Sequence, residues 1–415
     1  MRLAIIGSGI AGLTCSHVLG RAHDVVLYEA DDRLGGHANT VTVHDPEAGE
    51  LQVDTGFIVH NDRNYPNFVR LLTELRIGTI DTEMSFAVSD RSSGFAYRAT
   101  NLDTLFADRS NALRPAMWRM LVDIARFYRL ANRYLAAGGD DRSIGSFLTE
   151  GNFSPAFIDL HLVPMGAAVW SADPSTFDDI PAHSLLSFLS NHGLLGIGNR
   201  PQWRTIEGGS RTYVDAIASR FRGEIRLSTP VAEVVRTNDG VVVVDRAGER
   251  QHFDRVILAC HSDQALRLLA DPLPTERRVL SAFRYQPNRA ILHTDTAMLP
   301  ELPKVWAAWN YEHHGPNDLA ANVTYDMTNL QRLPGANRYL VSLNPADRIA
   351  RGRTIASFDY SHPVFDQPAV EAQAAFDKID GEGGVHFCGA YWGHGFHEDG
   401  MVSALRVCQA LGVDW

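Results

Sequence analysis

The sequence predicts an α/β protein in which a parallel sheet and its covering helices form one of two domains. Three observations support this fold class. A short apolar run at 2–6 leads into a glycine-rich turn, a second apolar run at 23–29 ends in an acid, and β-rich runs return at 225–258 and 385–387. The chain has 415 residues and exceeds the ceiling of about 250–300 residues for one hydrophobic core, so we expect two domains.

The first unit of the chain has the order strand, glycine turn, helix, strand, acid. The strand at 2–6 leads directly into Gly7, Gly9 and Gly12, and Glu29 ends the second strand. The first glycine permits a tight turn, the second lets backbone amides approach a pyrophosphate, and the third allows close packing of helix and strand. An acid at the end of the second strand accepts hydrogen bonds from a ribose. This order predicts a Rossmann-like dinucleotide-binding unit.

Later segments supply the elements that complete such a unit. Residues 225–258 contain several β-rich runs bounded by turn residues, and a helix is predicted just before them at 211–221. Near the C-terminus, a strand followed by a glycine turn is predicted at 385–390, and a helix at 399–410 that Asp399 can cap. We therefore expect the ten residues from Ala390 to Asp399 to form a loop.

Two segments after the second strand indicate which dinucleotide is bound. They are ADDRLGGH at 30–37 and VDTGF at 53–57. An arginine and paired glycines at this place resemble the R-x-G-G segment of the superfamily of FAD-binding amine oxidases, phytoene desaturases and protoporphyrinogen oxidases. The resemblance implies FAD as the cofactor. It also implies an FAD-binding domain of the glutathione-reductase and amine-oxidase type, interleaved with a substrate-binding domain of mixed sheet and helices.

The resemblance suggests how the chain is divided between the two domains. We assign 1–65, 201–275 and 380–415 to the FAD-binding domain. The remaining segments, 66–200 and 276–379, are assigned to the substrate-binding domain.

The resemblance also implies which residues contact FAD. Arg33 and Gly36 would lie along the diphosphate, although Arg33 could instead be a surface arginine beside Asp31 and Asp32. The N-terminus of the last helix would point at the flavin and stabilise negative charge on its reduced form. The full set of expected FAD contacts is Gly7, Gly9, Ile10, Ala11, Gly12, Glu29, Ala30, Arg33, Gly35, Gly36, His37, Gly56, Phe57, Ile58, Val231, Gly389, Gly400 and Met401. In this set Gly56 and Phe57 border the flavin ring, and Val231 packs on the adenine.

Longer motifs resemble one bacterial subgroup of this superfamily, whose members are FAD-dependent oxidoreductases encoded near cyclopropane-fatty-acid-synthase-like methyltransferases. The motifs are MGAAVWS at 165–171, NHGLL at 191–195, PQWRT at 201–205, LHTD at 292–295 and GFHEDG at 395–400. The resemblance implies action on lipid acyl chains, including desaturation of methyl-branched or unsaturated fatty acyl chains, and we expect O2 to reoxidise the flavin. It also implies a lipid or other hydrophobic substrate and a methyltransferase as a partner.

Other functions stay open at this point. Flavin amine oxidases typically use a lysine near the flavin and an aromatic cage, and the chain has only two lysines, Lys304 and Lys378. The strand at 289–294, where we expect such a lysine, has none, while Tyr391 and Trp392 could form part of a cage or simply pack. A fatty acid double-bond isomerase and a non-catalytic flavoprotein partner of a lipid methyltransferase are further alternatives.

The candidate catalytic residues are four side chains that can carry a proton at neutral pH. His397 and Glu398 come first because they lie in the segment expected to run beside the flavin, and His293 and His192 come next. The stretch CGAYWGHGFHEDGMVSA at 388–404 is rich in possible metal ligands. Its histidines lack the H-E-x-x-H spacing of a zinc site, however, and no metal is expected.

The net charge of −11 argues against nucleic-acid binding, which requires a concentrated positive face. One segment, 112–135, differs from the rest because it is amphipathic and carries a net charge of +4. It is either a membrane-surface helix or a substrate-domain helix with solvated arginines. No apolar run approaches the roughly 20 residues that span a bilayer. We expect a cytoplasmic protein with peripheral contact to the inner face of the membrane through 112–135.

Overall fold

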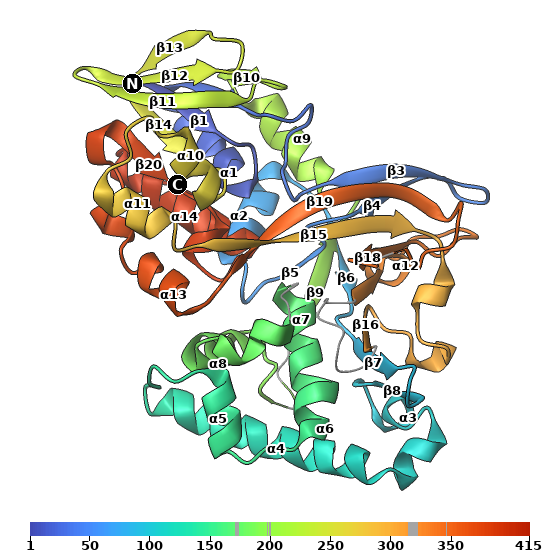
Figure 1. Cartoon of the computed structure of the whole chain (residues 1–415). Helices are drawn as coiled ribbons and strands as arrows, with labels where there is room; N and C mark the ends of the chain where they lie inside the picture. Colours follow the sequence, from blue (N-terminus) through green and yellow to red (C-terminus); the bar gives the residue numbers. More distant parts are fainter. Residues whose placement is uncertain (171–173, 197, 199–200, 314–322, 346) are drawn as a thin grey trace.

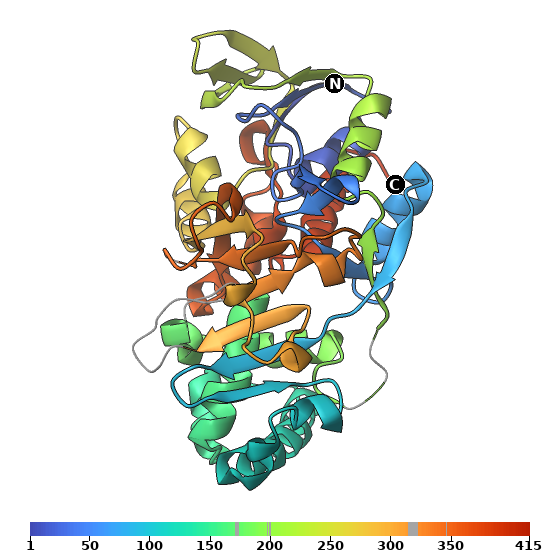
Figure 2. The same ribbon diagram turned by 90° about the vertical axis from the view of Figure 1, so that its right-hand side faces the viewer.

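The computed structural model describes the whole chain except residues 171–173, 197, 199–200, 314–322 and 346. Ser171, the last residue of the motif at 165–171, therefore lies outside the described residues. Figures 1 and 2 show three layers along the long direction of the molecule, which are a parallel sheet with its helices, a long antiparallel sheet and a group of helices.

The first layer contains the predicted parallel sheet, which has five strands. Its strand order is β10-β2-β1-β14-β20, and neighbouring strands run parallel. Leu3 and Ile5 of β1 are fully buried because helices cover the sheet, as all-parallel sheets require. The strands are β1 (Arg2–Ile6), β2 (Asp24–Tyr28), β10 (Glu224–Arg226), β14 (Arg255–Leu258) and β20 (Val385–Phe387). The α/β fold class is thereby confirmed.

Helices and a small antiparallel sheet complete this layer. Helix α1 lies against α14 and α9, and α2 lies against α14. The helices are α1 (Ile10–Leu19), α2 (Pro66–Leu75), α9 (Arg211–Arg220), α10 (Ser262–Leu268), α11 (Pro274–Leu280), α13 (Gln367–Gln373) and α14 (His397–Ala410), and the small sheet comprises β11 (Val231–Thr237), β12 (Gly240–Asp245) and β13 (Arg250–Phe253). Short 3₁₀ helices precede and follow β20, namely η6 (Phe376–Lys378), η7 (Glu382–Gly384) and η8 (Ala390–Trp392).

The core of this layer also takes side chains from segments that the sequence division assigns to the substrate-binding domain. They come from 66–75, 279–283 and 369–379, and Phe68, Phe283 and Phe376 are all buried there. The amphipathic helix α2 buries its apolar face, including Phe68, in the same core as α1 and α14. The cofactor-side core is thus larger than the segments 1–65, 201–275 and 380–415.

The second layer is a seven-stranded sheet of order β19-β15-β18-β17-β16-β7-β8. All neighbours are antiparallel except β16 and β7. Its strands are β7 (Phe86–Asp90), β8 (Phe95–Arg98), β15 (Arg284–His293), β16 (Trp309–His313), β17 (Val323–Asp326), β18 (Leu340–Leu343) and β19 (Thr354–Val364), with η4 (Thr296–Met298), η5 (Pro303–Val305) and α12 (Met327–Leu330) between them. The long pair β15 and β19 extends from the parallel-sheet layer across the middle of the molecule (Figure 1).

The third layer is helical and lies at the end of the molecule opposite the parallel sheet (Figures 1 and 2). Its elements are α3 (Leu102–Leu105), η1 (Arg109–Leu113), α4 (Pro115–Ala136), α5 (Ile144–Glu150), α6 (Pro155–Phe157), η2 (Ile158–Leu162), α7 (Val163–Trp170), η3 (Pro174–Asp179) and α8 (Ala182–Asn191). Two small sheets join the layers, β3 (Thr40–Asp45) with β4 (Gly49–Asp54), and β5 (Val59–Asn61) with β9 (Trp203–Ile206) and β6 (Thr79–Thr82). None of the helices in the described residues is long and apolar enough to cross a membrane.

The predicted start of the last helix is wrong by two residues. Helix α14 begins at His397 rather than Asp399, and η8 occupies part of the stretch expected to be a loop. Asp399 still caps the helix, but from inside its first turn, because its carboxylate accepts a hydrogen bond from the backbone N–H of Phe396 at 2.9 Å. His397 and Glu398 are therefore helical residues.

Candidate active site

The N-termini of α1 and α14 converge beyond the carboxyl ends of the strands of the parallel sheet. At Gly400, a Cβ atom would lie 2.7 Å from Ile10 Cγ2 and 3.8 Å from the backbone nitrogen of Ala11. Two helix N-termini that approach this closely direct their free amides and positive dipole ends to one place. The place therefore favours a ligand with negative charge.

In the glycine turn between β1 and α1, there is space for a ligand beside Gly9 but no space for a side chain at Gly12. A Cβ atom at Gly12 would lie 1.9 Å from the carbonyl oxygen of Gly7, so Gly12 is needed for packing. At Gly9, no heavy atom of the described residues lies within 4 Å of a Cβ position. Gly9 thus faces open space at the N-terminus of α1, where a pyrophosphate group is expected.

Glu29 organises the turn around this space. Its Oε2 accepts hydrogen bonds from the backbone nitrogen and the hydroxyl of Ser8, at 2.9 and 2.5 Å, and its Oε1 accepts one from the backbone nitrogen of Asp31 at 2.9 Å. The backbone N–H of Thr229 donates to the carbonyl of Glu29 at 2.8 Å, which brings Val231 at the start of β11 near the same acid. The residues expected at the ribose and the adenine thus lie on adjacent segments, and Ala30 beside them is exposed.

Arg33 is half-buried and braces the loop that carries the paired glycines. Its guanidinium donates to the carbonyl of Gly36 at 2.9 Å and, at longer distance, to those of Leu34 and Ala38. The backbone N–H of Gly35 donates to the carbonyl of Ser8 at 3.1 Å, which fastens this loop to the glycine turn. The contacts place Arg33 inside the loop at 34–38 rather than among solvated surface charges.

An aromatic wall made by His37 and residues of β19 lies beside this loop. The His37 ring stacks on Tyr360, with ring centroids 4.8 Å apart, and lies 5.4 Å from His362. Among the described residues, the buried Nε2 of His37 has no hydrogen-bond partner. Burial lowers the pKa of His37 well below its usual value, so the ring is neutral at physiological pH. A buried polar atom of this kind calls for a partner that a bound ligand can provide.

The residues present fit a flavin dinucleotide. The open space at Gly9, the two helix N-termini, the Glu29 turn and the unpartnered His37 nitrogen meet at one edge of the sheet, as a diphosphate with a ribose and a ring system requires. The remaining expected contacts lie on the same elements. The backbone N–H of Gly389 is held by the hydroxyl of Ser403 at 2.9 Å, and Met401 is fully buried in α14.

His397 is held between aromatic side chains. Its ring stacks on Phe57, with centroids 3.6 Å apart and planes 9° apart, and its Nε2 lies 2.8 Å from the Tyr213 hydroxyl. Burial lowers the pKa of His397 to about 3. His397 therefore connects the segment of Gly56, Phe57 and Ile58 to α9.

Glu398 serves as an N-terminal cap for another helix. Its carboxylate accepts hydrogen bonds from the backbone nitrogens of Asn67 and Phe68, each at 3.0 Å, and from the Asn67 side chain at 2.6 Å. The carboxylate thereby satisfies two of the first backbone N–H groups of α2, a helix whose own N-cap residue makes no side-chain hydrogen bond. Burial raises the pKa of Glu398 despite these bonds. All three hydrogen bonds that the Glu398 carboxylate accepts hold α2 in place. They occupy the oxygens that Glu398 would need in order to take a proton from a substrate.

His192 lies on an aromatic surface between the cofactor-side core and the helical core. It follows α8, its ring centroid is 4.0 Å from Phe188 and 5.6 Å from Phe396, and it stacks on Trp203 at 6.2 Å. Phe188 and Phe396 are themselves stacked at 5.0 Å. Phe396 packs against both cores and directly precedes His397. We call Phe188, His192, Trp203 and Phe396 the aromatic junction.

His293 is not brought together with these residues. It ends β15, where its Nε2 lies 2.8 Å from the Ser342 hydroxyl and its Nδ1 accepts from the backbone N–H of Asp295. Tyr285, near the other end of the strand, reaches α10 through a 2.9 Å bond with Ser262. Eight residues of extended strand separate His293 from Tyr285, which corresponds to roughly 27 Å. His192, His397 and Glu398 thus gather near the start of α14, and His293 lies elsewhere.

The structure also gives no support for an amine-oxidase role of the two lysines or of the proposed cage residues. Lys304 is exposed and pairs with Asp103 at 2.7 Å, and Lys378 is exposed on η6. Tyr391 and Trp392 are buried and pack against Phe283, with centroid distances of 5.0 and 5.4 Å. The packing interpretation of these aromatics is therefore the one that the structure supports.

Several residues of this site were not singled out from the sequence. Tyr213, Phe188 and Tyr360 come from separate segments and belong to none of the motifs named from the sequence, whereas Phe396 belongs to GFHEDG at 395–400 but was not chosen as a site residue. The one available signal was the position of Phe396 directly before His397. The other three became candidates only when the fold brought them into contact.

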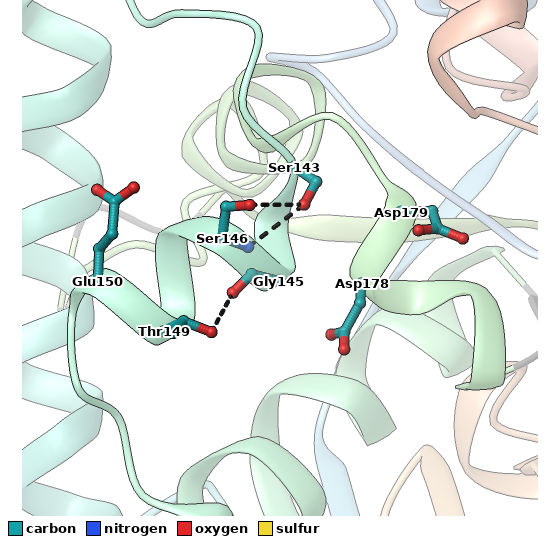
Figure 3. Close-up of a pocket in the computed structure, with 7 residues that line it drawn as sticks. All are labelled: Ser143, Gly145, Ser146, Thr149, Glu150, Asp178 and Asp179. Atoms are coloured by element: carbon teal, nitrogen blue, oxygen red, sulfur yellow. Dashed lines mark hydrogen bonds between the residues drawn. The ribbon is translucent and has the colours of Figure 1, made fainter.

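A hollow of about 430 Å³ lies in the helical layer between α5 and η3 (Figure 3). Ser143, Gly145, Ser146, Thr149, Glu150, Asp178 and Asp179 line it. In Figure 1, α5 lies in the helical group at the end of the molecule opposite the five-stranded sheet, whereas α1 and α14 lie beside that sheet. The hollow is thus separate from the residues that fit a dinucleotide.

Comparison with known proteins agrees with this geometry. The family model for flavin-containing amine oxidoreductases matches residues 10–355. A protein of Mycobacterium tuberculosis named as a flavin-containing monoamine oxidase is 25% identical over 300 residues, which cover 67% of this chain and 61% of that protein. An L-amino-acid oxidase of Demansia vestigiata is 23% identical over 320 residues, covering 71% of this chain and 58% of that protein. The chain spans about three fifths of the length of these relatives.

Solved structures show the same fold. A putrescine oxidase bound to putrescine superposes with a TM-score of 0.70 at 16% identity, covering 99% of both chains. A fatty acid isomerase from P. acnes that produces CLA superposes with a TM-score of 0.68 at 13% identity, covering 99% of this chain and 98% of that one. At these identities the likeness concerns the fold.

Proposed function

This chain belongs to the family of flavin-containing amine oxidoreductases and is an FAD-dependent oxidoreductase, and we propose that it dehydrogenates a methyl-branched or unsaturated fatty acyl chain of a membrane lipid, with O2 as acceptor. The observation that carries the proposal is the aromatic junction beside the start of α14. Its side chains are three aromatic rings and His192, whose pKa burial lowers to about 4. Such a surface is uncharged at neutral pH and suits an apolar chain.

The protein's own groups would orient the substrate, exclude water and hold a proton. FAD, when bound, accepts the hydrogen that leaves the substrate carbon. Trp203 and Phe396, which are half-buried, would pack along the chain and keep water away from it, and the buried Phe188 packs against both His192 and Phe396. A base is needed for the second hydrogen, which leaves as a proton.

His192 is the base that the geometry favours. Its Nδ1 lies 2.9 Å from the carbonyl oxygen of Phe188, and a carbonyl can only accept a hydrogen bond. The proton of the neutral ring therefore resides on Nδ1, and Nε2 keeps its lone pair. His397, by contrast, uses its Nε2 toward Tyr213. We assign His192 the role of proton acceptor and His397 that of a positioning residue.

Amine oxidation is the second candidate, because the curated relatives are named as amine and amino-acid oxidases. The positions of Lys304 and Lys378 oppose a lysine-assisted version of that reaction in this chain. Double-bond isomerisation is suggested only by the fold of the P. acnes enzyme. A non-catalytic role beside a lipid methyltransferase is the remaining alternative, and co-purification with that enzyme without any turnover would support it.

Product analysis tests the proposal. The holoenzyme is incubated in air with a phospholipid that carries an unsaturated, methyl-branched acyl chain, and the acyl products are identified by mass spectrometry. We expect a product that has lost two hydrogen atoms, with one peroxide formed per product. A product of unchanged mass would replace the proposal with isomerisation.

The proposal includes location and partner. We place the enzyme in the cytoplasm, with its substrate in the inner face of the membrane and a methyltransferase as the supplier of the branched chain. Cell fractionation and pull-down from the native host test these two statements separately from the chemistry.

A further inference from the structure

The four most exposed large apolar side chains of the described residues lie in one short segment. They are Leu113, Leu102, Val122 and Trp118, with exposed fractions of 86%, 75%, 56% and 53%. The segment covers α3, η1 and the start of α4 up to Val122. The other exposed large apolar side chains in the described part of the chain are at most 48% exposed, and they come from separate places, Met1, Leu227, Leu273, Leu302, Ile355 and Val402. We call the segment from 102 to 122 the apolar edge.

The apolar edge is held in place by contacts of Trp118. Its indole Nε1 donates to the carbonyl of Ala112 at 2.9 Å, next to Leu113, and its ring packs on Phe106 with centroids 5.5 Å apart. Val122 follows one helical turn later on the same side of α4. An ordered set of protruding apolar groups loses little side-chain entropy when it binds a partner.

Positive charge continues from the apolar edge along α4. Arg119, Arg129 and Arg133 are exposed. Asp123 is the one acid in the sequence between 112 and 136, and it is buried, where it pairs with Arg126 and Arg119. The solvent side of this 22-residue helix is therefore basic in a chain whose net charge is −11.

The two acids within the apolar edge already have partners. Asp103 pairs with Lys304 at 2.7 Å and with Arg109 at 3.1 Å. Asp108 accepts hydrogen bonds from the backbone nitrogen and the hydroxyl of Ser110, at 2.9 and 2.8 Å, and caps η1. These carboxylates offset only part of the arginine charge.

The position of α4 leaves this face free to meet a flat surface. Figures 1 and 2 both place α4 at the end of the molecule opposite the five-stranded sheet, with α3 near one of its ends in Figure 1. The helix lies along this end rather than pointing into the molecule.

We propose that the apolar edge and the arginines of α4 dock on the surface of a lipid bilayer that contains anionic lipids. Tryptophan and leucine side chains enter the boundary between headgroups and acyl chains, while arginines attract anionic headgroups. The arginines extend along the helix from 119 to 133 and the apolar groups protrude at one end, which suits a broad anionic surface. The inference goes beyond the proposed reaction and does not depend on it, because docking requires no turnover.

Vesicle co-sedimentation of the full-length holoprotein tests the inference. The vesicles are phosphatidylcholine alone, or phosphatidylcholine with phosphatidylglycerol. We expect binding to the anionic vesicles that weakens with added salt, and a loss of about tenfold or more in the double variant Leu113→Ser and Val122→Ser. The matched control, Leu227→Ser with Ile355→Ser, changes two exposed apolar side chains elsewhere and should bind as the parent does.

Three results would overturn the inference. They are an absence of binding to the anionic vesicles, equal loss in the test and control variants, and a change in oligomeric state in the test variant without any change in vesicle binding. The last result would assign the apolar edge to contact between two copies of the chain. Flavin absorbance is recorded for every variant, so a loss of fold or cofactor is scored separately from a loss of docking, and the product analysis described above scores the proposed reaction by itself.

Discussion

A Gly9→Val variant is expected to fold and to lose FAD. The Gly9 backbone has φ −63° and ψ −180°, which a β-branched residue adopts without strain, and no heavy atom of the described residues lies within 4 Å of its Cβ position. The new methyl groups would instead occupy the space assigned to the pyrophosphate. We expect the Kd for FAD to rise by about 100-fold or more, measured by titrating apoprotein with FAD.

Two further glycine variants make this result specific. Gly196 likewise has no heavy atom of the described residues within 4 Å of its Cβ position, so Gly196→Val should keep FAD. Gly12→Val should fail to fold, because its Cβ would lie 1.9 Å from the carbonyl oxygen of Gly7. Normal FAD affinity in Gly9→Val would show that the cofactor binds elsewhere.

A His192→Gln variant is expected to bind FAD normally and to lose most of its rate of flavin reduction by substrate. Removing a general base typically costs about 10²–10⁴-fold in rate. His192 belongs to the aromatic junction, where its ring contacts Phe188 and Phe396 rather than the glycine turn, so cofactor affinity should not change. Rapid mixing without oxygen measures the rate directly.

The pH dependence of flavin reduction by substrate gives a second test of His192 as the base. Burial lowers the pKa of His192 to about 4, so the ring is a neutral base above that pH and becomes protonated below it. The parent rate should therefore be flat from pH 7 to pH 5 and should fall only near pH 4. His183, exposed on the same helix, supplies the control variant His183→Gln. An equal loss of rate in both variants would remove His192 as the base.

The cofactor side of the fold was predictable because its signals are local. The strand at 2–6, the glycine spacing and the acid at 29 determine one supersecondary unit within about thirty residues, and packing only completes it. The start of α14 was misplaced because Asp399 caps from within the first turn. An aspartate can cap a helix either from the residue directly before it or from its third residue, as Asp399 does, and the sequence does not distinguish the two.

The substrate side was less predictable because its contacts are not local. Phe188, Trp203 and Phe396 meet only after segments far apart in the chain pack together. Glu398 caps α2, an element more than 300 residues earlier, and no pattern near Glu398 indicates this. His293 shares residue type with His192 and His397, but the length of β15 carries it away from them.

Anaerobic flavin reduction with matched substrates tests the central claim most directly. The holoenzyme is mixed without oxygen with an unsaturated, methyl-branched acyl lipid, with putrescine or with benzylamine, and flavin absorbance is followed. The uncharged aromatic junction and the surface positions of both lysines predict bleaching by the lipid and none by the amines. Bleaching by either amine, with none by the lipid, would contradict the account and identify the protein as an amine oxidase.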